Sequence, residues 1–280
     1  MMSKITADHK GQQISAVIIT KNEEKNLAKC LESLPFCDEI IVVDSMSTDQ
    51  TEIIARKNPK VKFFNQPFLG YGPQKRMAVN MASNDWIFSI DADEWATEQL
   101  TSEMLQLKPS LDHLKYKIFS IPRTLIFLGK SLNFSGENKR PVIRFFNRKY
   151  ANFNDVLVHE EIVPLASLDK NLPQIFKLKH ELLHQSYSSL EDYLGRLNHY
   201  TTAMSRKILD SKSSDKQQIP STLILGVRFF YTFIKIYVFY AGFMDGIRGF
   251  IWSLSSAFAN AIKYAKYYEL LLNKQSNQKN

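Results

Sequence analysis

Cysteine is scarce in this chain of 280 residues, which contains only Cys30 and Cys37. Two cysteines are too few for a disulfide framework, and their spacing matches no metal-binding or redox motif. We therefore expect both to be ordinary thiols in a reducing compartment.

A secretory signal and a long apolar run are also missing. Residues Met1 to Lys10 are polar and contain no apolar segment of the kind that directs secretion. No stretch of about 18 uncharged apolar residues occurs, so the sequence does not indicate an ordinary transmembrane helix. These absences predict that the catalytic portion is cytoplasmic.

The charge balance is basic, with 36 Lys and Arg against 28 Asp and Glu and a formal net charge of +8. A basic surface suits nucleic acid, anionic lipid or phosphorylated substrates, and charge alone does not choose among them. No zinc knuckle or aromatic single-strand platform accompanies the charge, so we expect no nucleic-acid partner. The length and the 44% of hydrophobic residues fit one large domain, or one domain with an appendage.

Short apolar runs alternate with helical patterns in the first hundred residues. This alternation predicts an α/β fold with a parallel sheet and right-handed crossovers. The expected strands span residues 14–20, 40–43, 61–65 and 86–90. Polar groups follow three of these strands directly, at residues 20–23, 44–49 and 91–93. Ligands bind at the carboxyl ends of parallel strands, so these groups are expected to meet at one edge.

The sequence Asp91-Ala-Asp93 ends the fourth expected strand. Two carboxylates in this position provide the hard oxygen ligands that Mg²⁺ and Mn²⁺ prefer. A divalent cation there would stabilise the charge of a departing nucleoside diphosphate. The alternative is two solvated aspartates in a turn. Asp44, which ends the second strand, fits either a nucleobase or ribose contact or a helix cap.

These motifs resemble the family 2 glycosyltransferases of the GT-A fold. The resemblance rests on Val17-Ile-Ile-Thr-Lys-Asn-Glu23, Val42-Val-Asp-Ser-Met-Ser-Thr-Asp49 and Asp91-Ala-Asp93, which match in order and spacing. The sequence is more specifically similar to the bacterial lipopolysaccharide-core β-glucosyltransferase branch and resembles it from about Ile14 to Glu269. The branch likeness rests on Gly70-Tyr-Gly-Pro-Gln-Lys75, Ser89-Ile-Asp-Ala-Asp-Glu94, Val158-His-Glu160, His184-Gln-Ser-Tyr187, Leu190-Glu-Asp-Tyr193 and Gly242-Phe-Met-Asp-Gly-Ile-Arg-Gly249.

The resemblance implies a role for each matching position. The residues implied in nucleotide-sugar binding are Thr20, Asn22, Glu23, Asp44, Lys75 and Asp91. The residues implied in holding Mg²⁺ or Mn²⁺ are Asp93, Asp91 and His184. Inversion needs a general base for the acceptor hydroxyl. Glu160 is favoured for this role, and Asp155 is the second candidate. The alternative for either residue is a surface carboxylate without a catalytic role. His159 fits a structural or acceptor-positioning role.

Two departures from family patterns bear on the site. Family members commonly have a glycine where this chain has Met46, and a left-handed backbone there would strain methionine. The turn that contacts the base is therefore expected to be reshaped. The Q-x-x-R-W motif of processive synthases is absent, which favours transfer of a single sugar.

The second half contains charged and aromatic patterns with open interpretations. Arg144 and Arg148 would share a face on a strand and meet phosphates, or form a solvated edge. Ser188 and Glu191 form a capping-box pattern at the start of a helix. Aromatic residues crowd the segment from Leu223 to Tyr268, with basic residues among them. This composition favours an anionic membrane interface, the alternative being a helical hairpin packed on the domain or on a second subunit.

Together these patterns predict a GT-A catalytic domain at residues 14–185 and a membrane-associated helical region at 186–272. Residues 1–13 are expected to be flexible and 273–280 to be a disordered tail. The predicted reaction is inverting transfer of glucose from UDP-glucose to a lipid-linked saccharide of the lipopolysaccharide core or another envelope glycan. The predicted location is peripheral, on the inner face of the bacterial inner membrane.

Other functions remain as alternatives at this stage. Transfer to a polyprenyl-phosphate carrier is compatible with the aromatic C-terminal region. A sugar-nucleotide pyrophosphorylase would have a glycine-rich loop after the first strand, whereas residues 20–23 contain no glycine. A scaffold with an inactive domain is disfavoured because Asp91, Asp93 and Glu160 are all present.

Overall fold

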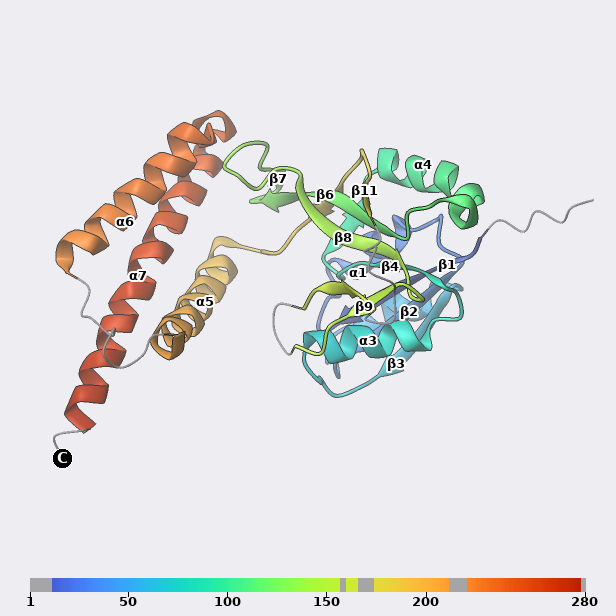
Figure 1. Ribbon diagram of the computed structural model, residues 1–280, viewed down its shortest axis with the longest axis horizontal. Helices are drawn as coiled ribbons and strands as arrows, with labels where there is room; N and C mark the ends of the chain where they lie inside the picture. The colour runs from blue at the N-terminus through green and yellow to red at the C-terminus, as the bar shows by residue number, and fades with distance from the viewer. Residues whose placement is uncertain (1–11, 157–159, 166–173, 212–220, 278–280) are drawn as a thin grey trace, which may run out of the picture. The chain divides into compact units, whose positions relative to one another are not determined.

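The computed structural model describes residues 12–156, 160–165, 174–211 and 221–277 (Figure 1). The chain divides into two compact units. The first comprises Met1–Thr124 and Lys139–His184, and the second comprises Leu125–Asn138 and Gln185–Asn280. The division after His184 lies next to the boundary expected from the sequence, whereas no sequence pattern indicated that residues 125–138 belong with the C-terminal unit.

Four parallel strands form the start of the sheet in the first unit. They are β1 (Ile14–Thr20), β2 (Glu39–Asp44), β3 (Val61–Asn65) and β4 (Trp86–Ser89), in the order β3-β2-β1-β4. All four lie where the apolar runs predicted them, because uninterrupted β-branched and aromatic segments suit strands covered on both faces. The predicted α/β class is confirmed.

The remaining strands make the sheet mixed. β8 (Arg140–Asn147) pairs antiparallel with β4 and with β6 (Ile118–Phe127). β12 (Leu182–His184) pairs antiparallel with β5 (Glu94–Ala96), and this register sets His184 opposite Glu94. The shorter strands are β7 (Lys130–Ser131), β9 (Ala151–Phe153), β10 (Ile162–Pro164) and β11 (Ile175–Lys177). β9 and β10 form a separate two-stranded sheet.

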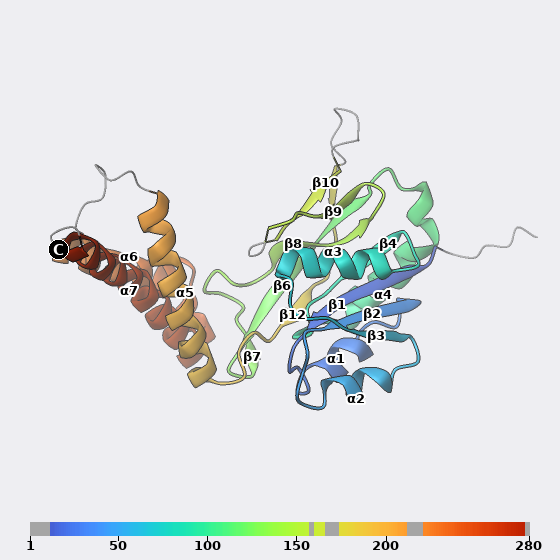
Figure 2. The same cartoon turned by 90° about the horizontal axis from the view of Figure 1, so that it is seen from below.

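Helices cover both faces of the sheet (Figure 2). On one face, Ala16 and Ile18 of β1 share a core with α1 and α4. On the other, Val17 of β1 packs with Ala78 and Val79 of α3. Successive strand residues point to opposite faces, so one apolar strand supplies both cores. The helices of this unit are α1 (Leu27–Glu32), α2 (Thr51–Arg56), α3 (Tyr71–Met81) and α4 (Glu98–Leu107), with a 3₁₀ turn at Lys108–His113.

Glu39 at the start of β2 is a buried carboxylate with several donors. It accepts hydrogen bonds from Ser15 Oγ, Lys62 Nζ and the Ser83 backbone N–H. Burial raises its pKa, but these donors outweigh burial and lower the pKa from 4.5 to about 2. Because the folded pKa lies below the ordinary value, the stabilisation is complete above about pH 4.5 and is lost as the pH falls towards 2.

We expect Glu39→Gln to lower the free energy of unfolding by about 3 kcal/mol near neutral pH, since each pKa unit corresponds to about 1.4 kcal/mol. The difference from the unchanged protein shrinks as the pH approaches about 2.5. Urea unfolding at the two pH values measures it. An equal loss at both would contradict the assignment to an ionised Glu39.

The described part of the second unit contains three long helices around an aromatic core. The helices are α5 (Leu190–Ser211), α6 (Thr222–Ile234) and α7 (Ile247–Asn277). α6 continues as a π-helical segment (Lys235–Phe239), and a 3₁₀ turn (Gly242–Asp245) precedes α7. Phe127, Tyr193 and Trp252 pack together at its centre. The helix α7 continues through Asn277, past the start of the tail predicted to be disordered, and residues 278–280 lie outside the description.

The predicted capping box of α5 is displaced by one residue. The Ser189 hydroxyl accepts from the backbone N–H of Asp192, and the Asp192 carboxylate accepts from the backbone N–H of Ser188. The prediction of Ser188 with Glu191 was therefore wrong in register. Two adjacent serines and two adjacent acids make both registers available, and packing of Tyr193 into the core selects this one.

Part of the branch motif at residues 242–249 has a structural role. Asp245 accepts hydrogen bonds from the backbone N–H groups of Asn133 and Phe134 and from the Ser135 hydroxyl. A Cβ at Gly249 would lie 1.8 Å from the carbonyl oxygen of Gly242, so only glycine fits there. The motif therefore fastens the segment 125–138 to the turn between α6 and α7.

Candidate active site

The two aspartates of the D-x-D motif lie in a turn between β4 and β5. The Asp91 carboxylate is shared by two cations, with Lys75 Nζ 2.7 Å from Oδ1 and Arg144 Nη2 2.5 Å from Oδ2. Burial raises the pKa of Asp91, but Arg144 and then Lys75 outweigh it, so the pKa lies well below its usual range. Asp91 is therefore held ionised, with both oxygens engaged.

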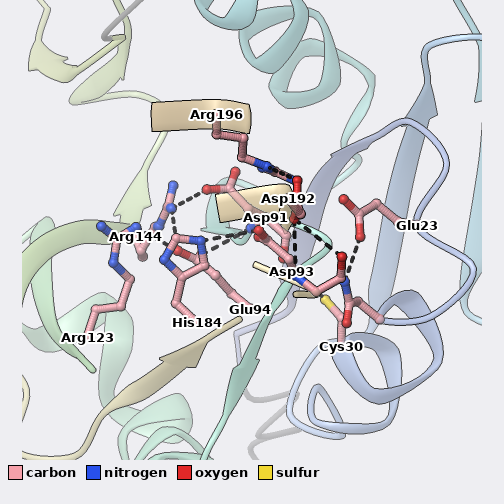
Figure 3. Close-up of polar contacts among 12 residues, drawn as sticks. Glu23, Cys30, Asp91, Asp93, Glu94, Arg123, Arg144, His184, Asp192 and Arg196 are labelled. Atoms are coloured by element: carbon pink, nitrogen blue, oxygen red, sulfur yellow. Dashed lines mark hydrogen bonds and ion pairs between the residues drawn. The ribbon is translucent and has the colours of Figure 1, made fainter. Parts of the chain in front are cut away.

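Glu94 joins this arrangement from the start of β5. Its side chain is 0% exposed, and Oε1 lies 2.7 Å from Arg144 Nη2 and 2.9 Å from Arg123 Nη1. Its other oxygen accepts from the Asp91 backbone N–H at 3.1 Å. Figure 3 shows Arg144 and Arg123 converging with these carboxylates on the D-x-D turn. Glu94 and Arg144 thus fix both the backbone and the side chain of Asp91.

Arg144 has neither of the roles proposed for it from the sequence. It is buried, so it is not part of a solvated edge, and its guanidinium is committed to carboxylates rather than open to phosphate. Arg148 lies beyond the end of β8 and pairs with Asp85 and the Ala82 carbonyl oxygen. The expectation that the two arginines share a face was wrong, because the strand ends at Asn147.

Lys75 connects Asp91 to the favoured general base. Its Nζ lies 2.7 Å from Glu160 Oε1 and 2.7 Å from Asp91 Oδ1, and its side chain is buried. The helix α3 can approach the 154–156 segment because Gly72 has no side chain. A Cβ there would lie 2.5 Å from the carbonyl oxygens of Asn154 and Val156. The motif Gly70 to Lys75 therefore brings the Glu160 region to the D-x-D turn.

Asp155 lies in a different setting. Its carboxylate pairs with Arg76 Nη1 at 2.9 Å, and its side chain is 71% exposed. Arg76 also donates to the Phe153 carbonyl oxygen. These contacts describe a surface ion pair on the outer side of α3, whereas Glu160 is nearly buried and joined to Asp91 through Lys75. The geometry favours Glu160 over Asp155 as the base, and His159 lies outside the described residues.

Asp93 and His184 form the second part of the D-x-D site. His184 Nε2 lies 3.3 Å from Asp93 Oδ2, because β12 pairs with β5 directly after the turn. Within the described ranges, no group of three His, Cys, Asp or Glu side chains is close enough to hold a metal ion by itself. A carboxylate with one imidazole still fits Mg²⁺ or Mn²⁺, which take their other ligands from water and substrate phosphates. Asp91 could join through the lone pairs that Lys75 and Arg144 leave free, although these two cations already compensate its charge.

Four of the six residues implied in nucleotide-sugar binding lie at the ends of β1 and β2 or in the loops that follow these strands. Asn22 donates its backbone N–H to Ser47 Oγ and accepts from the Thr48 N–H through Oδ1. The Glu23 backbone N–H donates to Thr51 Oγ1. The hydroxyl of Thr20 is buried without a hydrogen-bond partner among the described residues, so it can still donate to or accept from a ligand.

Comparison with known proteins identifies the chain. Residues 15–159 match the model of Glycosyl transferase family 2. The chain belongs to this family. A protein of Rickettsia typhi named as an uncharacterized glycosyltransferase is 33% identical over 93% of this chain and 88% of its own. The lipopolysaccharide core biosynthesis glycosyltransferase LpsC of Rhizobium meliloti is 28% identical over 91% of this chain and 92% of its own.

Among solved structures, residues 1–349 of S. aureus TarS in complex with UDP-GlcNAc align over 95% of this chain and 92% of that chain. The identity is 14% and the TM-score is 0.44. The sequence match establishes the family, and the sheet order, with its D-x-D turn after β4, is that of the predicted GT-A fold.

The turn after β2 was expected to be reshaped around Met46, but its backbone keeps the conformation that a glycine there would favour. Met46 has a φ of 62°, in the left-handed region that glycine favours. Both oxygens of Asp44 are engaged by Ser47, one by its hydroxyl and one by its backbone N–H at 2.6 Å. Asp44 therefore holds this family 2 transferase's turn in shape, and a contact to the base would add to that role.

Two residues of the site were missed by the sequence reasoning. Glu94 was quoted only as part of a motif, and Arg123 was not considered. Arg123 gave no local signal, because it lies on β6 and reaches the turn only through the pairing of β6 with β12 and of β12 with β5. Glu94 did give one, since a carboxylate directly after a D-x-D is out of place in a buried strand unless a cation pairs with it.

Proposed function

We propose that this family 2 transferase moves a single glucose from UDP-glucose to a saccharide of the lipopolysaccharide core, or a related envelope glycan, with inversion. The observation that carries the proposal is Lys75, which joins the D-x-D carboxylate Asp91 to Glu160 at equal distances of 2.7 Å. This places an acidic donor site and a candidate base side by side. The relative from Rhizobium, named for lipopolysaccharide core biosynthesis, supports the acceptor class.

Each group then has a defined part in the reaction. Glu160 accepts the proton of the acceptor hydroxyl as that oxygen forms its bond to the anomeric carbon. The bond from that carbon to the diphosphate breaks, and the nucleoside diphosphate leaves with the electron pair. Asp93 and His184 would hold a divalent cation, which supplies positive charge to the leaving phosphates. Thr20, Asn22, Glu23, Asp44, Lys75 and Asp91 line the donor side.

The proposed setting is the cytoplasmic face of the bacterial inner membrane, with the enzyme bound peripherally and its acceptor anchored in lipid. The exposed apolar residues of α6 and α7 support this setting. They also fit the second candidate function, transfer to a polyprenyl phosphate. Analysis of the labelled product separates the two, because sugar on a mild-acid-labile phosphate lipid would replace sugar on a saccharide.

Titration with UDP-, GDP- and CMP-sugars by calorimetry tests the donor class. We expect one UDP-sugar to bind in the presence of Mn²⁺, and Asp93→Ala to weaken that binding by about 10-fold or more, since metal bridging of the phosphates would be lost. Asp210→Ala, a surface change on α5, serves as the control. No binding of any donor by folded protein would overturn the proposal.

Replacing the base separates chemistry from binding. Glu160→Gln is expected to lower kcat by about 10²–10⁴-fold while leaving the donor Kd within about threefold, because the amide cannot take the proton. Glu161→Gln changes the neighbouring exposed carboxylate and is the matched control. If Asp155→Asn abolishes turnover and Glu160→Gln does not, the base is Asp155.

A further inference from the structure

Large apolar side chains are exposed along both long helices of the second unit. On α6 they recur on one stripe, and on α7 they form another. The α6 stripe contains Leu223, Val227, Phe230, Tyr231, Ile234 and Val238, and the α7 stripe contains Ile247, Phe250, Leu254 and Phe258. Their spacing of three and four residues gives each helix one continuous apolar side.

Exposure is high both at the start of α6, where Leu223 is 74% exposed, and at the turn that joins the helices. Phe239 is 78% and Ile247 is 66% exposed, and Phe243 and Met244 are also exposed. No residue of α6 is buried. A soluble chain seldom leaves so many aromatic side chains in water unless another phase or molecule covers them.

The opposite side of α6 packs against α7 (Figure 1). Phe233 and Tyr237 contact Phe250, and Thr232 Oγ1 accepts from Asn260 Nδ2. These contacts settle which side of α6 faces its partner helix. The exposed stripe of α6 is therefore not the side that holds the helical hairpin together, whereas Phe250 of the α7 stripe takes part in that contact.

Two cations that have no neighbouring carboxylate among the described residues lie where α6 meets α7. The Arg228 guanidinium on α6 lies 3.9 Å from the centre of the Tyr264 ring on α7, and Lys263 Nζ lies 5.5 Å from the same ring. Arg228 Nε is buried and has no hydrogen-bond partner, and within the described part of the chain neither cation forms an ion pair. Burial and then Arg228 lower the pKa of Lys263.

We propose that α6, α7 and the turn between them bind an anionic phospholipid bilayer, and that Arg228, Lys263 and Tyr264 form the site for a lipid phosphate. Two neighbouring cations without an acid are complementary to a phosphate group. A helical hairpin with exposed apolar stripes and basic residues matches helices lying in the headgroup region. The proposal rests on the membrane setting given above and uses no step of sugar transfer.

The helix length and its charges favour lying in the interface over spanning. Residues 222–239 form one stretch of 18 residues with mean hydropathy 1.5, apolar enough to cross a membrane by composition alone. That stretch is about 27 Å long at 1.5 Å per residue, slightly less than the hydrocarbon thickness of about 30 Å. Arg228 would lie near its middle, where a charge is least favourable.

A second copy of the chain is a poorer fit for this surface. In a two-fold dimer the patch would meet itself. The Arg228 and Lys263 of one subunit would then come towards the same cations of the other, with no carboxylate between them. An anionic bilayer compensates both charges and covers both stripes.

The test is sedimentation of the full chain with vesicles of phosphatidylcholine alone or with about 30% phosphatidylglycerol. We expect binding to require the anionic lipid, and Arg228→Gln with Lys263→Gln to reduce partitioning by about 20-fold, since each basic residue near an anionic surface contributes about fivefold. The control removes the same charge from the same unit with Arg206→Gln and Lys207→Gln, which lie exposed on α5. Circular dichroism and thermal unfolding verify that each variant folds.

Each outcome decides the proposal. An equal loss in both double variants would show diffuse electrostatic attraction and overturn the phosphate site. Vesicle binding that does not depend on phosphatidylglycerol but is lost in Phe239→Ser would also overturn the phosphate site. Insertion of apolar side chains would then account for the binding. A concentration-dependent dimer that Phe230→Ser dissociates, without vesicle binding, would assign the surface to a second copy. Donor binding by calorimetry, measured on the same samples, reports separately on the transferase function.

Discussion

Replacing Arg144 with methionine is expected to lower the free energy of unfolding by about 3–5 kcal/mol, the range for removing one partner of a buried ion pair. The reason is Glu94, which is 0% exposed and would retain Arg123 as its one cationic partner among those given above. Asp91 would also lose one of its two cations. Where the variant still folds, we expect transfer activity to fall by about 10-fold or more, because the D-x-D turn loses its support.

The matched control for Arg144 lies close by in the chain. Arg148→Met removes an ion pair with Asp85 in which both side chains are partly exposed, so its loss should amount to about 1 kcal/mol or less. Urea unfolding of both variants measures the difference. Equal losses would show that burial of Glu94 adds nothing. The double variant Arg144→Met with Glu94→Met should recover part of the loss, because it leaves no unpaired carboxylate at position 94.

Among glycine-to-alanine substitutions, Gly72→Ala is expected to cause the largest loss of activity. The new Cβ would lie 2.5 Å from two backbone carbonyl oxygens, those of Asn154 and Val156, and backbone cannot yield as a flexible side chain can. The 154–156 segment must move, which separates Glu160 from Lys75. We expect activity to fall by about 100-fold and stability by about 1–3 kcal/mol.

Gly195→Ala is the control for this change. Gly195 lies within α5, and an added Cβ there meets nothing within 4 Å. Alanine is the better helix former, so the control should gain up to about 1 kcal/mol and keep its activity. Steady-state rates with saturating donor, together with thermal unfolding, report both quantities. A Gly72→Ala enzyme of normal activity would show that the approach of α3 to the 154–156 segment does not matter for turnover.

The sequence predicted the first half of the sheet closely. Apolar strands alternating with helices determined β1 to β4, since this signal is local and repeated. It also placed Asp91 and Asp93 directly after the fourth strand, at the carboxyl edge of the sheet. The later strands are only three residues long in several cases, and their pairing depends on contacts between distant segments. His184 was found only through the family resemblance, because nothing near it in sequence announces its pairing opposite Glu94.

The cationic partners of the acids could not be predicted in the same way. Arg144 follows an apolar residue and precedes two phenylalanines, a pattern shared by many edge strands. Whether such an arginine faces water or a buried carboxylate depends on which face the sheet register assigns to it, and β6 and β8 shift register between Phe119 and Ser120. Local propensity does not encode that irregularity.

The membership of residues 125–138 in the helical unit limits how this enzyme can be divided. Leu125, Phe127 and Leu132 pack with Tyr193 and Trp252, so the transferase segment contributes part of the core on which the helices depend. A recombination event that joined the first 184 residues to a different C-terminal region would leave those apolar side chains without partners. The two regions therefore depend on one another, and exchanging the helices would require exchanging residues 125–138 with them.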